Sequence, residues 1–167
     1  RNGYVDKNRT LHKRPVFREN GTDNPTGRDI IGLFWWPDNA YFIAMIMGSG
    51  NTSVDVYKIT VTISSGSKYP SINTYTLIDN IPSVTTALAE EFRPSFVLAP
   101  NSTSTETLYM CVGGTSLYQT DGSSLVDITA AQSPAITNLT TVTDVAYLNQ
   151  RILCLVKDTQ TVNYSST

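Results

Sequence analysis

The sequence is poor in the residues that build most catalytic and metal sites. It contains one histidine, His12, and two cysteines, Cys111 and Cys154, among 167 residues. None of these is spaced as a zinc-ligand pair, and a single histidine near an irregular terminus does not complete a Ser-His-Asp or Cys-His set. We therefore expect no catalytic residues, no cofactor and no metal, and we do not expect an enzyme.

Charge and long apolar runs are also scarce. Charged residues make up 16% of the chain, against about 25% in an average globular domain. No apolar run approaches the roughly 20 residues that span a bilayer. Ser and Thr are abundant instead, with nine Tyr, a mixture that suits sheet surfaces and turns better than helices. These features predict an all-β fold with very little helix and no membrane partner.

The small net charge of −2 is unevenly distributed. The first 18 residues carry a charge of about +5, which leaves about −7 on the remainder. The basic side chains are those of Arg1, Lys7, Arg9, Lys13, Arg14 and Arg18. We interpret residues 1–27 as an extended basic N-terminal arm. Such an arm can be a solvated, irregular lead-in, or it can dock on an acidic protein neighbour or touch DNA, of which we favour the protein.

The clearest structural signal lies in residues 107–129. Three short runs of strand-forming residues are separated by Gly113-Gly114 and by Asp121-Gly122. Both dipeptides supply the positive φ angles that tight hairpin turns need. The segment therefore predicts an antiparallel β-meander, with strands at Leu108–Val112, Ser116–Thr120 and Leu125–Ile128.

A comparable group of four strands precedes this meander. Its expected strands are Ile30–Trp36, Tyr41–Met47, Ser53–Ile63 and Ile72–Ile78. Because Ile30–Trp36 is almost wholly apolar, we expect it to be buried on both faces. The alternating pattern of Ser53–Ile63 predicts a change of buried face near Tyr57. A further segment, Val84–Glu91, is expected to form one or two helical turns.

The order of strands recurs along the chain. Ser95–Ala99 adds a first strand to the meander, and a third group follows at Val142–Leu148, Ile152–Val156 and Thr161–Tyr164. The repeat interval is about 64 and then about 49 residues, which is typical of β-propeller blades. We expect a propeller portion over residues 28–167, with blades at about 29–79, 93–129 and 142–167.

Two alternatives accompany the propeller hypothesis. A β-sandwich also produces short strands at regular spacing. A closed propeller has at least about four blades, so three blades predict either a fragment of a longer polypeptide or sheets completed by other chains. We favour the fragment and therefore expect an incomplete propeller.

Several side chains are candidates for binding or chemistry. Trp35 and Trp36 are adjacent on one strand, so only one of them can face a sugar or base, and we expect at least one in the core. The acidic residues Asp127, Asp144 and Asp158 lack calcium-loop spacing and are interpreted as solvated turn residues. The neighbours Glu90 and Glu91 point in different directions on a helical turn, unlike a glycosidase pair.

The two cysteines lie inside apolar strand runs, so we expect buried free thiols. In the repeat alignment, Cys111 and Cys154 fall on opposite faces of their strands. This placement is an argument against a disulfide between them.

Short segments at both ends resemble one family of phage proteins. The first are Asn2–Val5 and Leu11–Pro15, although Val16 stands where the family has Gly after Arg-Pro. The others are Asp144–Arg151, Val162–Ser165 and the hairpin Leu117–Gly122. Together these segments resemble the tail-hub or tail-nozzle proteins of short-tailed bacteriophages, which include packaged-DNA stabilization proteins.

This resemblance implies a structural virion protein of a phage tail. In such a tail, copies of the chain form a ring, expected to be a hexamer, below the portal and adaptor. The ring extends the channel for double-stranded DNA without sequence-specific binding, and it retains the genome until ejection. Assembly takes place in the cytoplasm of the host bacterium. The alternative function is a carbohydrate-binding β-domain, such as a receptor-binding or adhesin module.

Overall fold

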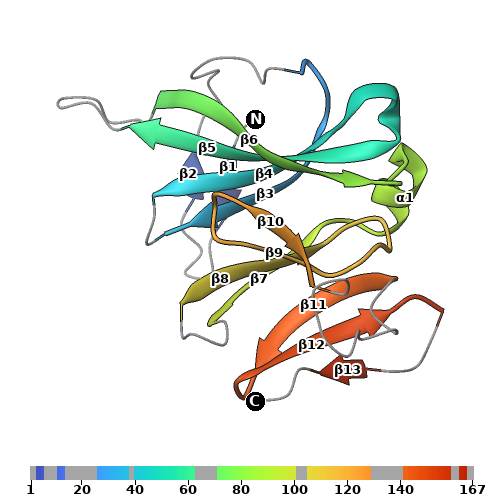
Figure 1. Cartoon of the computed structure of the whole chain (residues 1–167). Helices are drawn as coiled ribbons and strands as arrows, with labels where there is room; N and C mark the ends of the chain where they lie inside the picture. Colours follow the sequence, from blue (N-terminus) through green and yellow to red (C-terminus); the bar gives the residue numbers. More distant parts are fainter. Residues whose placement is uncertain are drawn as a thin grey trace.

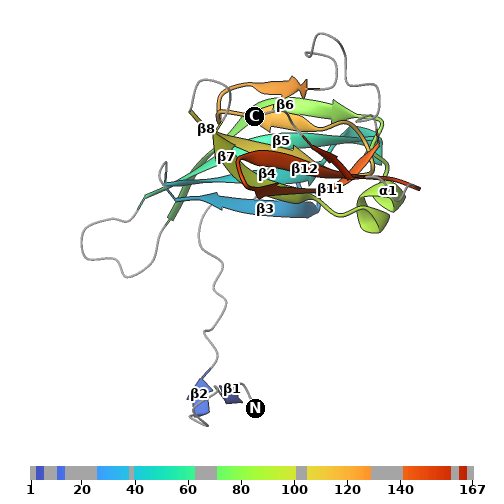
Figure 2. The same cartoon turned by 90° about the horizontal axis from the view of Figure 1, so that it is seen from below.

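A computed structural model describes most of the chain. The described residues are 3–5, 11–13, 26–37, 40–62, 71–100, 105–128, 141–158 and 162–164. In these ranges the strands form four antiparallel sheets, and three of the sheets are stacked as layers (Figure 1). The fourth is a hairpin of β1 (Gly3–Val5) and β2 (Leu11–Lys13), which Figure 2 shows apart from the layers.

Each layer is a meander in which consecutive strands pair. Sheet 1 contains β3 (Ile30–Trp36), β4 (Tyr41–Met47), β5 (Ser53–Thr62) and β6 (Ser71–Pro82). Sheet 2 contains β7 (Ser95–Pro100), β8 (Glu106–Cys111), β9 (Tyr118–Thr120) and β10 (Leu125–Asp127). Sheet 3 contains β11 (Val142–Leu148), β12 (Arg151–Val156) and β13 (Val162–Tyr164).

Two short helices lie in the connections that the structure describes. The 3-10 helix η1 (Ser49–Asn51) joins β4 to β5, and α1 (Thr86–Glu91) joins sheet 1 to sheet 2. The hydroxyl of Thr85 caps α1 by accepting a hydrogen bond from the backbone N–H of Leu88 at 3.3 Å. No helix in the described part of the chain has the length and apolar character needed to cross a membrane.

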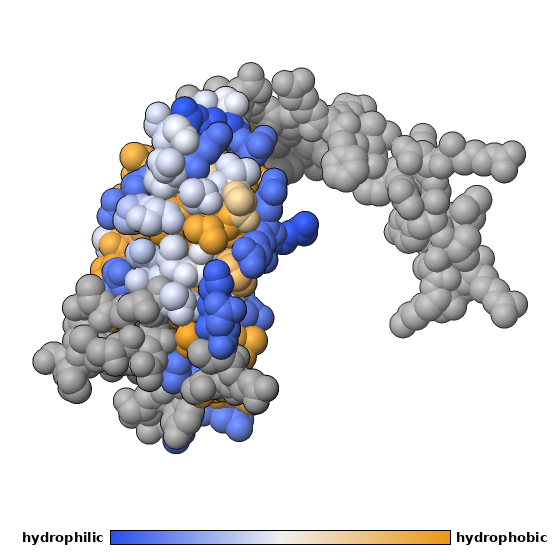
Figure 3. All heavy atoms as spheres, turned by 90° about the vertical axis from the view of Figure 1, so that its right-hand side faces the viewer, coloured by the Kyte–Doolittle hydropathy of each residue, from blue (hydrophilic) through white to orange (hydrophobic). Residues whose placement is uncertain are grey.

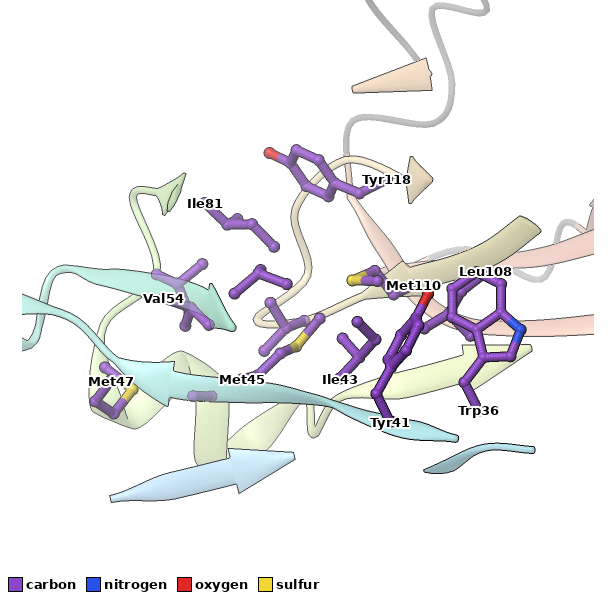
Figure 4. Packing of buried hydrophobic residues seen from close by; sticks show 14 residues of the cluster. Trp36, Tyr41, Ile43, Met45, Met47, Val54, Ile81, Leu108, Met110 and Tyr118 are labelled. Carbon is purple, nitrogen blue, oxygen red and sulfur yellow. The ribbon is translucent and has the colours of Figure 1, made fainter. Parts of the chain in front are cut away.

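The space between sheets 1 and 2 holds the largest hydrophobic cluster (Figure 4). Its buried members are Trp36, Tyr41, Ile43, Met45, Met47, Val54, Val56, Ile81, Val84, Ala89, Leu108, Met110, Val112 and Tyr118. Trp36 also donates a hydrogen bond from Nε1 to Oε1 of Glu106 in sheet 2 at 2.6 Å. At the other end of β3, a Cβ at Gly32 would lie 2.7 Å from Cβ of Pro94, so the backbones approach closely there.

A second cluster fills the space between sheets 2 and 3. Its buried members are Ala99, Tyr109, Cys111, Leu117, Ile128, Val142, Val145, Ile152 and Cys154. Polar contacts join the same two sheets. Ser95 Oγ donates to Oδ1 of Asp144 at 2.5 Å, and the N–H of Val142 donates to the carbonyl of Thr115 at 2.7 Å. Sheet 2 therefore has a hydrophobic cluster on each face.

The prediction of an all-β fold built from antiparallel meanders is confirmed. The described strands stack as three sheets rather than two, so the two-layered sandwich does not describe them. The short helix in Val84–Glu91 is also present as α1. In β5 the buried side chains change from Val54 and Val56 on one face to Tyr57 and Ile59 on the other, as predicted.

The prediction that Ile30–Trp36 is buried on both faces is wrong. This segment forms β3, the edge strand of sheet 1, and Trp36 is its buried residue. Leu33 and Trp35 are exposed because they lie on the face of sheet 1 that points away from sheet 2. In many sheets a run of apolar residues indicates a strand that is buried on both faces. Here every second side chain of the run points to the outer face of sheet 1, at the end of the stack.

The two predicted tight turns of the meander differ from expectation. Gly113 and Gly114 do have positive φ angles, of 63° and 64°. However, the pairing of β8 with β9 begins only at Met110 and Tyr118. The residues between them form an open loop, because Thr115 pairs with Val142 of sheet 3. At the other turn Gly122 alone supplies a positive φ, of 86°. Asp121 organises this turn by accepting the backbone N–H groups of two serines, Ser123 at 2.8 Å and Ser124 at 2.9 Å.

Replacing Gly122 by alanine is expected to destabilise the stack of sheets 1 and 2. Its new Cβ would lie 2.0 Å from Oη of Tyr41, and the φ of 86° is in the left-handed region. We expect a loss of about 1–2 kcal/mol from the backbone conformation and about 1–3 kcal/mol from overpacking. Equilibrium denaturation of Gly122→Ala against the wild type measures the sum.

Gly50→Ala is the matched control for this substitution. Gly50 has a similar φ of 75°, but its nearest neighbour to a new Cβ is Oγ1 of Thr52 at 3.8 Å. The control should therefore lose only the conformational part of the free energy of unfolding. Equal losses for the two variants would contradict the contact between the Gly122 turn and Tyr41.

Candidate functional site

Large exposed hydrophobic side chains gather at the two ends of the stack. The forward face of a sheet is defined here as the side toward the next sheet in the chain, and the rear face as the opposite side. Seven large hydrophobic residues are exposed among the described residues, and all seven lie on the two end faces. The rear face of sheet 1 carries Ile30, Leu33, Trp35 and Leu77, at 45%, 54%, 42% and 52% exposure. The forward face of sheet 3 carries Leu148, Leu155 and Val162, at 59%, 46% and 48%.

Aromatic side chains dominate the rear face of sheet 1. Trp35 lies directly opposite Phe42 in the neighbouring strand, and their ring centroids are 4.7 Å apart. Tyr57 and Tyr75 meet edge to face at 6.4 Å. Such cross-strand aromatic contacts stabilise a sheet and hold the rings in fixed orientations. The rear face therefore carries a preformed group of aromatic rings, and it also carries the hydrogen-bonded polar pair of Asp55 and Asn80.

Aliphatic side chains dominate the forward face of sheet 3. Strand pairing places Ala146 beside Leu153, and Leu155 beside Val162, on this face. The same pairing places the charged Arg151 beside Leu148 there. The two-residue turn Asn149–Gln150 has positive φ angles of 50° and 64°, which fixes the register of the hairpin between β11 and β12. In Figure 1, sheet 3 is the outermost layer at the bottom of the molecule.

The forward faces of the three sheets present cross-strand pairs in corresponding positions of their first two strands. These pairs are Phe34–Ile43 in sheet 1, Val97–Tyr109 in sheet 2 and Ala146–Leu153 in sheet 3. The first two pairs pack against the sheet that follows. The third pair lies on the end face, where Ala146 is exposed. Sheet 3 thus has a face of the kind that sheets 1 and 2 use for stacking.

The side of the molecule that carries α1 differs from the two end faces. In Figure 3 hydrophilic and intermediate residues predominate on this side, and the hydrophobic areas between them are small. Of the two predicted tryptophan candidates, Trp36 is buried at 1% exposure and Trp35 is exposed. This confirms the expectations that the two rings face different sides and that at least one belongs to the core.

The acidic candidates are not brought together. Asp127 and Asp144 lie on strands, so the interpretation that both are turn residues is wrong, and only Asp158 lies in a turn. Asp144 is held toward sheet 2 by the hydroxyl of Ser95, next to a register shift in β11. Within the described ranges, no group of three His, Cys, Asp or Glu residues is placed to hold a metal ion.

An open groove of about 430 Å³ lies beside α1. It is lined by Glu90, Glu91, Phe92, Arg93, Pro94, Ser95, Thr143 and Asp144. Its acidic groups are interspersed with Arg93 and with backbone, and the hydroxyl of Ser95 is already bonded to Asp144.

Each of the two cysteines points toward the sheet that contains the other. Cys111 lies on the forward face of sheet 2 and Cys154 on the rear face of sheet 3, and both belong to the same buried cluster. The predictions of opposite faces and of buried free thiols are confirmed. Opposite faces do not keep the two thiols apart, however, because in consecutive sheets they place both side chains in the same interface.

Burial determines the chemistry of these thiols. It raises the pKa of Cys111 to about 12, with smaller contributions from Asp144 and Cys154, and it raises the pKa of Cys154 to about 11. Both groups are therefore neutral in the folded chain at ordinary pH. Since the thiolate is the reactive form, neither cysteine is a candidate nucleophile.

The basic arm falls mostly outside the described residues. Lys13 and His12 lie in β2, whereas Arg1, Lys7, Arg9, Arg14 and Arg18 lie outside them.

Comparisons with known proteins give no match to a family model, to a curated protein or to a solved structure. The function is therefore inferred from the residues and faces of the chain itself.

The buried thiols predict a pH-dependent stability. Because their pKa values are higher in the folded chain than the ordinary 9.0, their contribution to stability is fully present below about pH 9 and is lost as pH rises toward 11 to 12. The thiols should react with a disulfide reagent only after unfolding. Measuring their reaction rate against pH, with and without denaturant, tests this. Rapid labelling of either cysteine in the native chain at neutral pH would contradict their burial.

Proposed function

We propose that the chain is a structural virion protein of a phage tail. In this proposal it forms part of the nozzle or hub ring that extends the DNA channel below the portal and adaptor and retains the genome until ejection. The three stacked meanders are blades of a β-propeller portion. The terminal segments that resemble the tail-hub and tail-nozzle family support this assignment, as does the stacking of antiparallel sheets in chain order.

The observation that carries the proposal is the pair of exposed apolar end faces. Large exposed apolar areas on a small domain mark sites of protein association. The chain combines them with a low content of charged residues and nine Tyr, a residue type that is enriched in protein interfaces. An assembly protein needs such faces, whereas an enzyme of this size needs a convergent set of polar groups.

The distribution of charge supports the same role. The residues after position 18 carry about −7, so the body of the protein repels DNA phosphates. A channel wall that repels DNA lets the genome slide, and it requires no sequence-specific contact. The basic arm is then available for an acidic neighbour in the tail.

A carbohydrate-binding β-domain is the second candidate, and one observation favours it. The exposed indole of Trp35, held against Phe42, is an aromatic surface on which a sugar ring can stack. If this function holds, Trp35→Ala should abolish binding on a glycan array, while the chain remains folded. Wild-type binding to no glycan would remove this candidate.

The virion proposal is tested on purified particles of the phage that encodes the chain. Peptides of the chain should be found by mass spectrometry in DNA-filled particles, in a constant ratio to the portal protein. Antibodies against the chain should label the tail below the portal in electron micrographs. Particles that contain no trace of the chain, or a label at the receptor-binding fibres, would contradict the proposal.

A further inference from the structure

We propose that Cys111 and Cys154 form a disulfide across the interface of sheets 2 and 3 when the chain folds in the presence of a small-molecule disulfide. Both side chains are free thiols in this structure. The bond is a covalent modification that joins two consecutive sheets. The inference goes beyond the proposed function and does not depend on it, because it uses only the facing surfaces of these two sheets.

Strand pairing places the two cysteines at matching positions of the facing sheets. Cys111 lies opposite Ser95 in the pairing of β8 with β7, and Cys154 lies opposite Val145 in the pairing of β12 with β11. Ser95 and Val145 touch across the interface, since Oγ of Ser95 lies 3.4 Å from both the backbone nitrogen and the carbonyl oxygen of Val145. The two cysteines are therefore the cross-strand partners of two residues that are already in contact.

The two sheets are neighbouring layers (Figure 1) and approach closely at this point. Cα atoms of β11 come within 8 Å of Cα atoms of β7 and of β8, whereas stacked sheets commonly lie about 10 Å apart. A disulfide needs Cα atoms about 4.4–6.8 Å apart and side chains that point toward each other. Cys111 points forward from sheet 2 and Cys154 points back from sheet 3, and the two thiols are close enough that Cys154 contributes to the raised pKa of Cys111.

The surroundings of the two thiols favour a bond between them. Both belong to a buried cluster whose other members, such as Tyr109, Val142 and Ile152, are hydrophobic. A disulfide carries no hydrogen-bond donor, so the oxidised pair leaves no unsatisfied polar hydrogen in this cluster. Cys111 and Cys154 are 0% and 2% exposed, so the bond, once formed, is shielded from attack by reducing thiols.

The bond forms by thiol–disulfide exchange in two steps. The thiolate of one cysteine attacks a sulfur of the small disulfide, breaks its S–S bond and releases one small thiolate, which leaves a mixed disulfide on the protein. The thiolate of the other cysteine then attacks the protein sulfur of this mixed disulfide and releases the second small thiolate. The two protons lost by the cysteines pass to the two small thiols. One small disulfide is thus reduced while two cysteine thiols are oxidised.

Burial determines when this exchange takes place. Both thiols are neutral in the folded chain because burial raises the pKa of each, and the neutral thiol does not attack a disulfide. The exchange therefore takes place during folding, before the interface between sheets 2 and 3 has closed.

The test refolds the reduced chain in mixtures of oxidised and reduced glutathione. The wild type should lose the mass of two hydrogen atoms per chain, with no bound glutathione and no covalent dimer. The same titration is then made in concentrated guanidinium chloride. The equilibrium constant for forming the bond should be at least about 30-fold larger under folding conditions than in denaturant, because a disulfide that fits the native geometry stabilises the fold by a factor of this order.

Thermal unfolding measures the effect on the fold. The oxidised wild type should unfold roughly 5–10 °C above the reduced wild type. Cys111→Ala and Cys154→Ala are the matched controls, since each retains one thiol, cannot form the internal bond and should show no such difference between oxidised and reduced samples. If refolding is incomplete, export of the chain to the bacterial periplasm, an oxidising compartment, supplies the oxidised sample for the same measurements.

Three results would overturn the inference. The first is a wild-type chain that carries glutathione on each cysteine without forming the internal bond. The second is a product that contains only covalent dimers. The third is an equilibrium constant that is no larger under folding conditions than in denaturant, since this would show that the facing sheets hold the two sulfurs out of reach of each other. None of these results bears on the virion proposal, which is tested on purified particles.

Discussion

Each sheet of this protein depends on the packing of its faces against a neighbour. A meander of three or four short strands buries too little apolar surface to be stable alone. The middle sheet solves this by packing on both sides, with Met110 and Leu108 toward sheet 1 and Tyr109 and Cys111 toward sheet 3. The outer sheets have only one such neighbour within the described residues. Under the proposed assembly function, their outward faces are therefore the natural places for contact with a partner.

The same dependence explains the unusual composition. Inter-sheet contacts in this fold combine apolar packing with a few directed hydrogen bonds, such as that of Trp36 to Glu106 and that of Ser95 to Asp144. Neither of these two inter-sheet hydrogen bonds is an ion pair, so neither needs a positively charged side chain. Sheet surfaces rich in Ser, Thr and Tyr then meet solvent without many charged residues, which agrees with the charged content of 16%.

Local sequence predicted the strands well, because hydrophobic alternation and turn residues act over a few positions. It failed where a neighbouring sheet decides the outcome. The Gly113-Gly114 turn opens because Thr115 pairs with Val142, some distance along the chain. The exposure of Leu33 and Trp35 depends on β3 lying at an end of the stack, and the meeting of Cys111 with Cys154 depends on which sheets are adjacent. Trp35 was recognised as a candidate from its residue type, whereas Leu148 and Leu155 gave no signal, because apolar residues in a strand look the same whether or not a sheet covers them.

The buried side chains of β5 lie on one face of sheet 1 in its first half and on the other face in its second half, and this has a consequence for folding. Val54 and Val56 anchor the first half of this strand on one side of sheet 1, and Tyr57 and Ile59 anchor the second half on the other. A slip of one residue against β4 would turn every side chain over. Both hydrophobic anchors would then be lost at once, and polar Asp55 and Lys58 would enter the positions that they vacate. Burial on both faces of β5 thus specifies its register against β4. A specified register disfavours mispairing in a chain of many similar short strands.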